Sequence, residues 1–317
     1  MAQIADSTGF TDEDWENLFY YIDDKEITPL LGAGISREYF GSGEELAQNI
    51  AKKFEYPFLK TSDLAKVAQF AAIRKKGDSV QVRKFVANYI KSKELPDFND
   101  PSEPHRILSK LDLPIYITTN YDHLMYEALK KDGKNPVIEF CRWNDLAEIQ
   151  GRFSIFSEGK LKGKLNQFDY NNPLVYHIHG EVDNPQSMVL TEDDYLNFIV
   201  KLYVDIDKLF PVEIRNALAT RSIMFIGYSL SDWNLRIILR KIAEDMKSAA
   251  STHCSIQLTP TDVKPGNEGN VKEYLKTYFE TLQSVKLNIF WGTAVHFCHT
   301  LSEKSKNRSM RQNVYTS

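Results

Sequence analysis

The fold of this chain is decided by residues 115–124, which read IYITTNYDHL. The first four residues are apolar or β-branched and predict a short buried strand. Thr119, Asn120 and Asp122 follow, and side chains of these types end strands and begin helices. Because ligands bind at the carboxyl ends of the strands in α/β sheets, we expect Asn120 to lie at this edge and to contact the sugar of a nucleotide.

Three further strand ends carry small or polar residues of the kind that contact nucleotides. Apolar runs at residues 27–31, 174–178 and 222–226 each predict a buried strand. The residues that follow these runs are Gly32-Ala33-Gly34, His179-Gly180 and Gly227-Tyr228-Ser229. Glycine lets backbone amides approach a phosphate closely, and a serine hydroxyl suits a ribose or phosphate oxygen. The Gly-Ala-Gly turn lacks the third glycine of a dinucleotide fingerprint, so a plain tight turn stays an alternative.

The order of the predicted elements indicates one large α/β domain. Further strands are expected at residues 188–190, 254–258 and 287–291, and apolar residues at helical spacing fill the intervals between strands. This alternation predicts a Rossmann-like, doubly wound parallel sheet with helices on both faces. Residues 44–111 carry only helical patterns, so we expect an inserted helical subdomain that could cover the pocket.

The chain divides into three parts on this interpretation. Residues 1–26 contain an N-terminal helix, residues 27–303 form the nucleotide-binding domain, and residues 304–317 form a mobile tail rich in Lys, Ser and Asn. His177 and His179 share a face of their strand if that strand is regular, because side chains alternate along a strand. Asp122 either caps the helix that follows it or orients a site residue, and the cap is favoured.

Composition limits the classes of function. The chain has 317 residues, 42% of them hydrophobic and 26% charged, and a formal net charge of −4, so it shows no overall basic footprint for nucleic acid. No apolar run is long enough for a membrane helix and no signal-peptide pattern begins the chain, so we expect a cytoplasmic protein. The widely spaced Cys141, Cys254 and Cys298 include no Cys-x-x-Cys pair, so no structural metal site is predicted.

In this order, the four motifs resemble those of the sirtuin-like family. The family's motifs are Gly-Ala-Gly-x-Ser, Thr-Gln-Asn-x-Asp-x-Leu, His-Gly and Gly-x-Ser-Leu, and here they stand at residues 32–36, 118–124, 179–180 and 227–230. The chain lacks the family's four-cysteine zinc module and its Gly-Ile-Pro-Asp-Phe-Arg segment, and Thr119 replaces the usual glutamine. These departures argue against protein deacylation, and the chain is more similar to the bacterial anti-phage defence branch.

The resemblance implies an NAD glycohydrolase, which cleaves the nicotinamide–ribose bond to give nicotinamide and ADP-ribose and depletes NAD in abortive infection. The amide of Asn120 can fix a ribose hydroxyl and a water at once, and His179 can accept a proton, so we expect both to be catalytic. The residues expected to bind the rest of NAD are Gly32, Ala33, Gly34, Ser36, Asp122, Gly227 and Ser229.

Two other functions stay open at this point. A non-catalytic sensor of NAD or ADP-ribose would keep the glycine turns and Ser229 but would not need both Asn120 and His179. A protein deacylase is least favoured, because the zinc-binding cysteines are missing. A homo-oligomer is expected because the inserted helices and the basic tail could make contacts between copies, and no membrane contact is expected because no long apolar run is present. The resemblance also implies a separate activator, such as a translocase-type ATPase or a short Argonaute.

Overall fold

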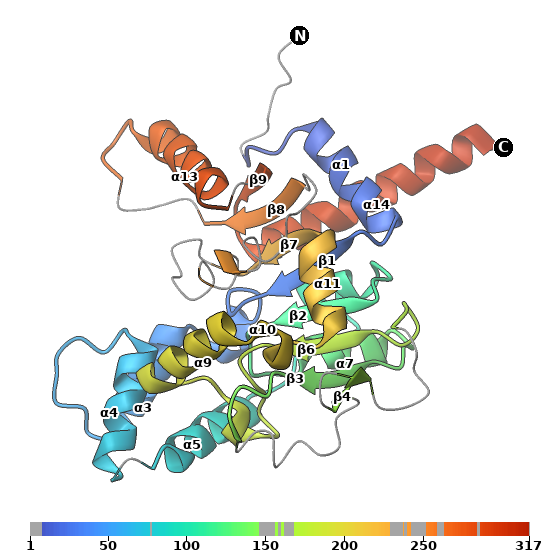
Figure 1. Ribbon diagram of the computed structural model, residues 1–317. Helices are drawn as coiled ribbons and strands as arrows, with labels where there is room; N and C mark the ends of the chain where they lie inside the picture. Colours follow the sequence, from blue (N-terminus) through green and yellow to red (C-terminus); the bar gives the residue numbers. More distant parts are fainter. Residues whose placement is uncertain are drawn as a thin grey trace.

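A seven-stranded parallel sheet forms the centre of the protein (Figure 1). The structure is a computed structural model, and of the 317 residues it describes 8–76, 78–145, 156–157, 160–161, 168–228, 237, 240–241, 252–258, 263–283 and 286–316. The strand order is β3-β6-β2-β1-β7-β8-β9. The strands are β1 (Ile27–Leu31), β2 (Ile115–Thr118), β3 (Val137–Phe140), β6 (Leu174–His177), β7 (Ser222–Ile226), β8 (Thr252–Gln257) and β9 (Lys286–Trp291).

The register of the four central strands places their carboxyl ends at one level. Leu31 at the end of β1 pairs with Thr118 of β2 and with Ile226 of β7. Thr118 in turn pairs with His177, the last residue of β6. All of these pairings are parallel, so the four predicted motifs begin side by side at the same edge of the sheet.

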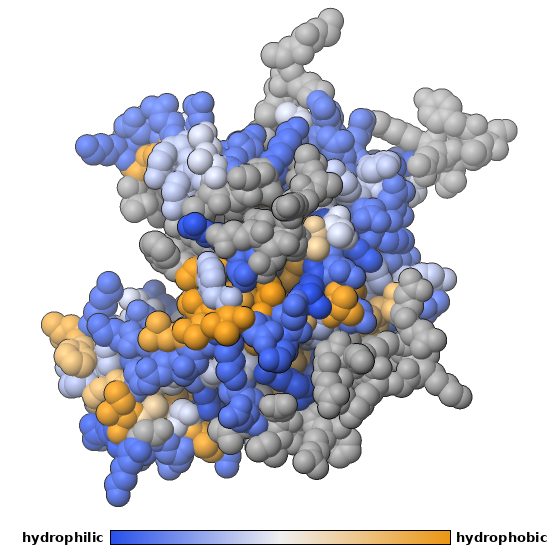
Figure 2. Space-filling view, viewed as in Figure 1, coloured by the Kyte–Doolittle hydropathy of each residue, from blue (hydrophilic) through white to orange (hydrophobic). Residues whose placement is uncertain are grey.

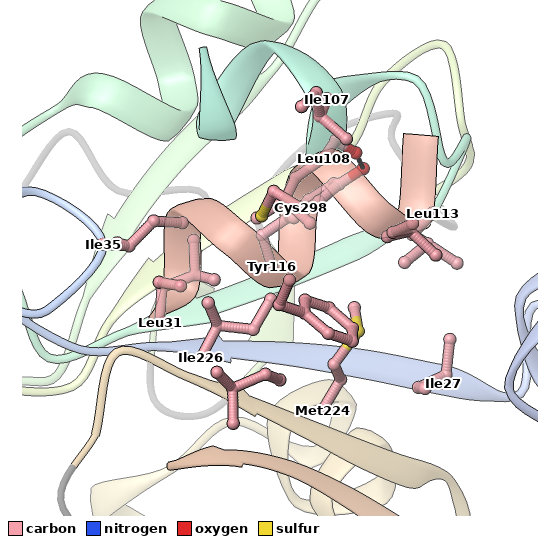
Figure 3. Close-up of a cluster of buried hydrophobic side chains, with 14 of the residues drawn as sticks. Ile27, Leu31, Ile35, Ile107, Leu108, Leu113, Tyr116, Met224, Ile226 and Cys298 are labelled. Carbon is pink, nitrogen blue, oxygen red and sulfur yellow. Dashed lines mark hydrogen bonds between the residues drawn. The ribbon is translucent and has the colours of Figure 1, made fainter. Parts of the chain in front are cut away.

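Helices cover both faces of the sheet, as predicted. One face packs against α1 (Asp12–Asp23), α6 (Pro104–Ser109), α7 (Leu124–Lys131) and α14 (Ala294–Thr316). Figure 3 shows part of this layer, where Tyr116 and Met224 of the sheet lie close to the helix that carries Cys298. The other face packs against α9 (Glu192–Val204), α10 (Ile206–Leu209), α11 (Val212–Thr220) and α13 (Glu268–Gln283). Burial on both faces explains why the central strands read as continuous apolar runs.

The helices predicted between the first two strands form a separate layer at the lower left of Figure 1. They are α2 (Arg37–Phe40), α3 (Gly43–Lys53), α4 (Leu64–Arg74) and α5 (Val80–Lys91), which precede α6. A third apolar core holds α3, α4 and α5 together, and it includes Val182, Met188 and Leu190 from the segment after β6. Because this core is shared, the helical layer is fixed against the edge of the sheet where the four motifs meet.

A buried ion pair also ties the helical layer to α9. The Arg83 guanidinium of α5 lies 2.6 Å from Asp194 Oδ1, and both side chains are almost completely buried. Asp194 closes a capping box with Thr191, the N-cap residue of α9. The other oxygen of Asp194 accepts hydrogen bonds from the Leu190 and Thr191 amides, so the arginine, the helix start and the preceding segment form one polar unit.

The strand expected at residues 188–190 does not form. These residues are extended but irregular, between the one-turn 3-10 helix η1 (Pro185–Ser187) and α9. The Val189 amide donates to the His179 carbonyl at 2.9 Å, and its carbonyl accepts from the Tyr121 hydroxyl at 2.6 Å. These residues are apolar because the side chains of Met188, Val189 and Leu190 are fully buried. The backbone of Val189 forms its hydrogen bonds with a loop and a side chain rather than with a neighbouring strand.

The backbone of residues 304–316, which were expected to form a mobile tail, is helical, since α14 continues to Thr316. Lys304 of this helix lies 3.1 Å from Asp12 and 5.5 Å from the centre of the Trp15 ring. Arg308 is paired with Asp23 and lies over the Phe19 ring. Contacts of Lys304 and Arg308 with α1 therefore hold the first turns of this basic segment against the fold.

The described residues between 137 and 172 include short strands. β3 forms the edge of the main sheet, and β4 (Phe156–Ser157) pairs with β5 (Lys160–Leu161) in a separate antiparallel ribbon. None of the described helices is long and apolar enough to cross a bilayer. Figure 2 shows apolar residues gathered across the middle of one face, in the region of α9, whose Leu196, Val200 and Val204 are exposed.

Candidate active site

A pocket of about 300 Å³ lies between the carboxyl edge of the sheet and the inserted helices. Its polar wall includes most of the residues that the sequence singled out, namely Ala33, Ser36, Asn120, Asp122, His179 and Gly227. Its apolar wall comes from the helical layer and includes Phe40, Leu46, Leu64 and Ile90. The pocket thus combines convergent polar groups with an apolar lining, which is the usual character of a small-molecule site.

The two glycine turns that follow β1 and β7 pack directly against each other. The Gly32 amide donates to Ile226 O at 2.8 Å and the Gly34 amide to Gly227 O at 2.9 Å. A Cβ on Gly34 would lie 2.8 Å from Gly227 Cα, and Gly227 itself has a φ of +78°. Backbone packing therefore requires glycine at these positions, whatever the ligand.

This packing changes which amides could bind a phosphate. The Gly34 amide is committed to Gly227, and the amides of Ile35 and Ser36 donate to Gly32 O and Ala33 O. In the turn as described, the Ala33 amide is the one for which the structure gives no acceptor, and Ala33 lines the pocket. The helix that follows, α2, is a single turn, so its dipole contributes little to binding a phosphate. Gly32 and Gly34 support the wall, whereas Ala33 forms its surface.

Asn120 is held at the polar wall by hydrogen bonds in two directions. Its amide nitrogen Nδ2 donates to Gly32 O and to Ser36 Oγ, each at 3.2 Å. Its backbone N–H donates to Thr118 Oγ1 at 3.0 Å. With Nδ2 engaged by the glycine turn, the side-chain oxygen Oδ1 is the atom left to accept a hydrogen bond from a ligand.

His179 is distant from both glycine turns in the sequence but lines the same pocket. Its ring packs edge-on against Tyr195 and Phe198, with centroids 5.5 and 5.4 Å apart. Burial lowers the pKa of His179 to about 4, so the imidazole is neutral at pH 7. Its Nε2 is buried and has no hydrogen-bond partner in the described part of the chain. Most buried polar atoms in folded proteins have a hydrogen-bond partner, so this nitrogen is available to accept a hydrogen bond from a ligand.

His177 and His179 do not have the common surroundings expected of a regular strand. β6 ends at His177, and Gly180 turns the chain with a φ of +82°. The His177 ring packs edge-on against His123, with centroids 5.7 Å apart, whereas His179 contacts α9. A side chain on Gly180 would collide with Ser187, so the turn that redirects His179 depends on glycine.

Asp122 directly precedes His123, the N-cap residue of α7, so Asp122 is not the helix cap that the sequence favoured. Its Oδ1 accepts from the Leu124 amide at 3.0 Å. Burial raises the pKa of Asp122, while His105, the Leu124 amide and Ser36 act in the opposite direction. Asp122 also lines the pocket, so its carboxyl group reaches the site as well as the helix start.

Several residues of the pocket were missed from the sequence, and some of them are aromatic. Tyr121, Tyr195 and Tyr228 line it. The Tyr228 hydroxyl donates to Leu31 O at 3.0 Å and lies 2.9 Å from Thr119 Oγ1, which connects β7 to β1 and β2. Tyr195 is on α9, and no local pattern indicates that this helix reaches the site. Ser229, expected to bind NAD, lies outside the described residues.

The described residues provide little for a metal ion. Cys141, Cys254 and Cys298 are buried and free, and burial raises the pKa of each thiol. Among the described side chains, His123, Glu181 and Asp183 are the one group close enough together to share an ion. These three already form ion pairs: His123 Nε2 is 2.9 Å from Glu181, and Asp183 is 2.7 Å from Lys91.

Comparisons with known proteins relate the chain to one family and to several named relatives. The family model described as SIR2-like domain matches residues 114–282. The protein named NAD(+) hydrolase ThsA from Enterococcus faecium is 28% identical over 230 residues, which cover 71% of this chain and 41% of that protein. Its namesake from Bacillus cereus (strain MSX-D12) is 27% identical over 212 residues, covering 67% of this chain and 38% of that protein.

A more distant relative is Defense-associated sirtuin 2 from Bacillus subtilis, 26% identical over 54% of this chain and 15% of that protein. A solved structure described as "Structural Basis for the Mechanism and Regulation of Sir2 Enzymes" aligns with 95% of this chain and 100% of its own, with a TM-score of 0.44 and 11% identity. The chain spans about two fifths of the length of the ThsA proteins that it matches. Since the family model covers more than half of the residues, the chain belongs to the SIR2-like domain family.

Proposed function

We propose that this chain is an NAD glycohydrolase, which hydrolyses the nicotinamide–ribose bond and releases nicotinamide and ADP-ribose. The observation that carries the proposal is the meeting of Asn120 and His179 in one pocket, beside the packed turns of Gly34 and Gly227. These residues come from the ends of four adjacent parallel strands, where open α/β sheets bind nucleotides.

The chemistry requires little acid or base strength from the protein. Cleavage of a glycosidic bond passes through an oxocarbenium-like state. Nicotinamide leaves as a neutral ring from a cationic one, so the protein has to hold the ribose, position a water and stabilise the developing positive charge. Positioning of this kind contributes up to about 7–11 kcal/mol to lowering a barrier.

Asn120 and His179 have distinct parts in this proposal. Asn120 Oδ1 accepts a hydrogen bond from a ribose hydroxyl or from the attacking water, while Nδ2 stays bonded to Gly32 O and Ser36 Oγ. His179, which burial keeps neutral, accepts the proton that the water or the ribose hydroxyl releases. The apolar wall formed by Phe40 and Leu46 limits the access of bulk water.

The names of the relatives support the same substrate. Four curated relatives are called NAD(+) hydrolase ThsA, and a fifth is called Defense-associated sirtuin 2. We extend the proposal to anti-phage defence by depletion of cytoplasmic NAD in abortive infection. Self-assembly and activation by a separate sensor protein, such as a translocase-type ATPase or a short Argonaute, belong to this extended proposal.

The test is the release of nicotinamide from NAD by the purified protein, followed by chromatography of the products. Asn120→Ala and His179→Ala should each reduce the rate by about 100-fold or more, the usual contribution of a positioned acid–base group. Asn49→Ala and His296→Ala, which change the same residue types at exposed positions, are the matched controls and should keep wild-type rates.

Other outcomes would point elsewhere. Wild-type rates in both site variants would remove these residues from the mechanism. Tight binding of ADP-ribose by calorimetry without any release of nicotinamide would favour the sensor. Release of nicotinamide only in the presence of an acetylated peptide would favour the deacylase.

A further inference from the structure

Asn120 lies just beyond the end of β2, so no strand ladder fixes its backbone. Its side chain and its N–H are bonded to Ser36, Gly32 and Thr118, as described above. Besides Oδ1, which is left for a ligand, the other polar atom of Asn120 is its main-chain carbonyl oxygen, which lies 2.8 Å from Nδ1 of His177. His177 is therefore the one contact that reaches Asn120 from the neighbouring strand β6 in the described structure.

We propose that His177 is a positioning residue of the reaction, which holds the main-chain carbonyl of Asn120 through Nδ1–H and thereby sets where the Asn120 side chain lies in the pocket. This inference rests on the proposed NAD cleavage. His177 is not part of the pocket lining, so it acts through Asn120 and does not touch the substrate.

The protonation of His177 follows from its partner. A carbonyl oxygen only accepts hydrogen bonds, so Nδ1 must carry the proton. Nε2 of the neutral ring is then an acceptor, and it is buried without a partner in the described part of the chain. An unpaired buried nitrogen is unfavourable, and a leucine at the end of this buried strand would avoid it. The hydrogen bond to Asn120 is the feature of an imidazole that a leucine cannot provide.

His123 helps to keep His177 in this neutral form. Burial acts to lower the pKa of His123, but its hydrogen bond and charge interaction with Glu181, together with Asp183 and Asp122, raise it overall. Burial and the charge of His123 then lower the pKa of His177 to about 4, against the opposing effects of Asn120 O and Glu181. His177 is thus a permanent donor at physiological pH rather than a titrating group.

Two amide substitutions distinguish the hydrogen bond from simple packing. In His177→Asn the nitrogen Nδ2 can occupy the position of Nδ1, whereas in His177→Gln the nitrogen lies near the position of Nε2. Since a misplacement of about 1 Å can cost about 100-fold in rate, His177→Gln and His177→Ala should lose about that much in kcat. His177→Asn should stay within about threefold of wild type, and KM for NAD should change less than kcat in all three variants.

The controls separate this inference from the proposed function. Wild type and Asn120→Ala are assayed in parallel, and each variant is checked by thermal unfolding. If wild type cleaves NAD and Asn120→Ala does not, equal rates for His177→Asn and His177→Gln, or losses that follow the melting temperature, overturn the positioning role. If wild type does not cleave NAD, the proposed reaction fails instead.

A measurement on the protein alone tests the positioning role in either case. Long-range proton–nitrogen NMR should show His177 protonated at Nδ1 between pH 5.5 and pH 8. The side-chain amide resonances of Asn120 should move in His177→Gln and stay near wild type in His177→Asn. Protonation at Nε2, or an Asn120 side chain that does not respond to either substitution, would overturn it.

Discussion

Replacing Gly34 by alanine is expected to destabilise the fold even without any ligand. The added Cβ would lie 2.8 Å from both the Cα and the carbonyl oxygen of Gly227, well inside van der Waals contact. These neighbours are backbone atoms of a turn and not the end of a flexible side chain, so the two turns have to move apart. That movement stretches the 2.9 Å hydrogen bond from the Gly34 amide to Gly227 O.

The magnitude follows from three effects. Overpacking a tight contact costs about 1–3 kcal/mol, and loss of the hydrogen bond costs about 0.5–1.5 kcal/mol. The lower entropy of the unfolded chain offsets this by about 0.4–1 kcal/mol, because alanine is less flexible than glycine. The free energy of unfolding should therefore fall by about 1–4 kcal/mol.

Urea denaturation followed by tryptophan fluorescence measures this change. Gly43→Ala is the matched control, because Gly43 also lines the pocket but an added Cβ meets nothing within 4 Å. Gly43 lies in the first turn of α3, where alanine should be neutral or stabilising by up to about 1 kcal/mol. If Gly34→Ala unfolds at the same urea concentration as wild type but binds NAD more weakly, Gly34 serves the ligand and our reasoning from turn packing is wrong.

Two further predictions concern buried charge. Arg83→Met should lower the free energy of unfolding by about 3–5 kcal/mol, because it leaves the buried carboxylate of Asp194 without its partner. Arg74→Met removes one partner of an exposed ion pair and should change the free energy of unfolding far less. Equal effects of the two substitutions in urea denaturation would contradict this. Burial lowers the pKa of His177 and His179 to about 4, so the unfolded chain binds protons that the folded chain does not, and stability should fall as pH drops from about 6.5 towards 4. Each histidine should lower the free energy of unfolding by about 1.4 kcal/mol between pH 7.5 and pH 5.5, measured for His179 as the difference between wild type and His179→Phe. The kcat/KM for NAD should keep its value down to about pH 5, and a fall in kcat/KM near pH 6.5 would contradict the low pKa of His179.

The strands could be predicted because each is a local signal. The strands β1, β2, β6 and β7 are buried on both faces, so most of their residues are apolar. Glycine or polar residues that end a strand follow each of them. The same rule misled at residues 188–190, where burial beneath the helical layer makes an equally apolar run without a neighbouring strand. Burial alone therefore does not distinguish a strand from a covered loop.

The candidate site could be predicted in part. Asn120, His179 and Ala33 were identifiable because they follow strand ends that a parallel sheet brings to one edge. Tyr195 was not, because it belongs to a helix that the chain folds back onto the pocket. The pKa of His179 could not be predicted from the sequence either, because burial in the folded protein lowers it to about 4 from an ordinary 6.5.

The sequence by itself determined the parallel sheet, its order of motifs and the set of polar residues at its edge, since apolar runs and turn residues act over a few neighbouring positions. Tertiary structure decided which atoms of those residues are available to bind a ligand. Asn120 Nδ2 is taken by Gly32, 88 residues away in the chain, and Asn120 O by His177, 57 residues away. Hydrogen bonds over such separations depend on how strands and turns pack, so a local pattern can name Asn120 but cannot determine that its Oδ1 is the atom left for a ligand.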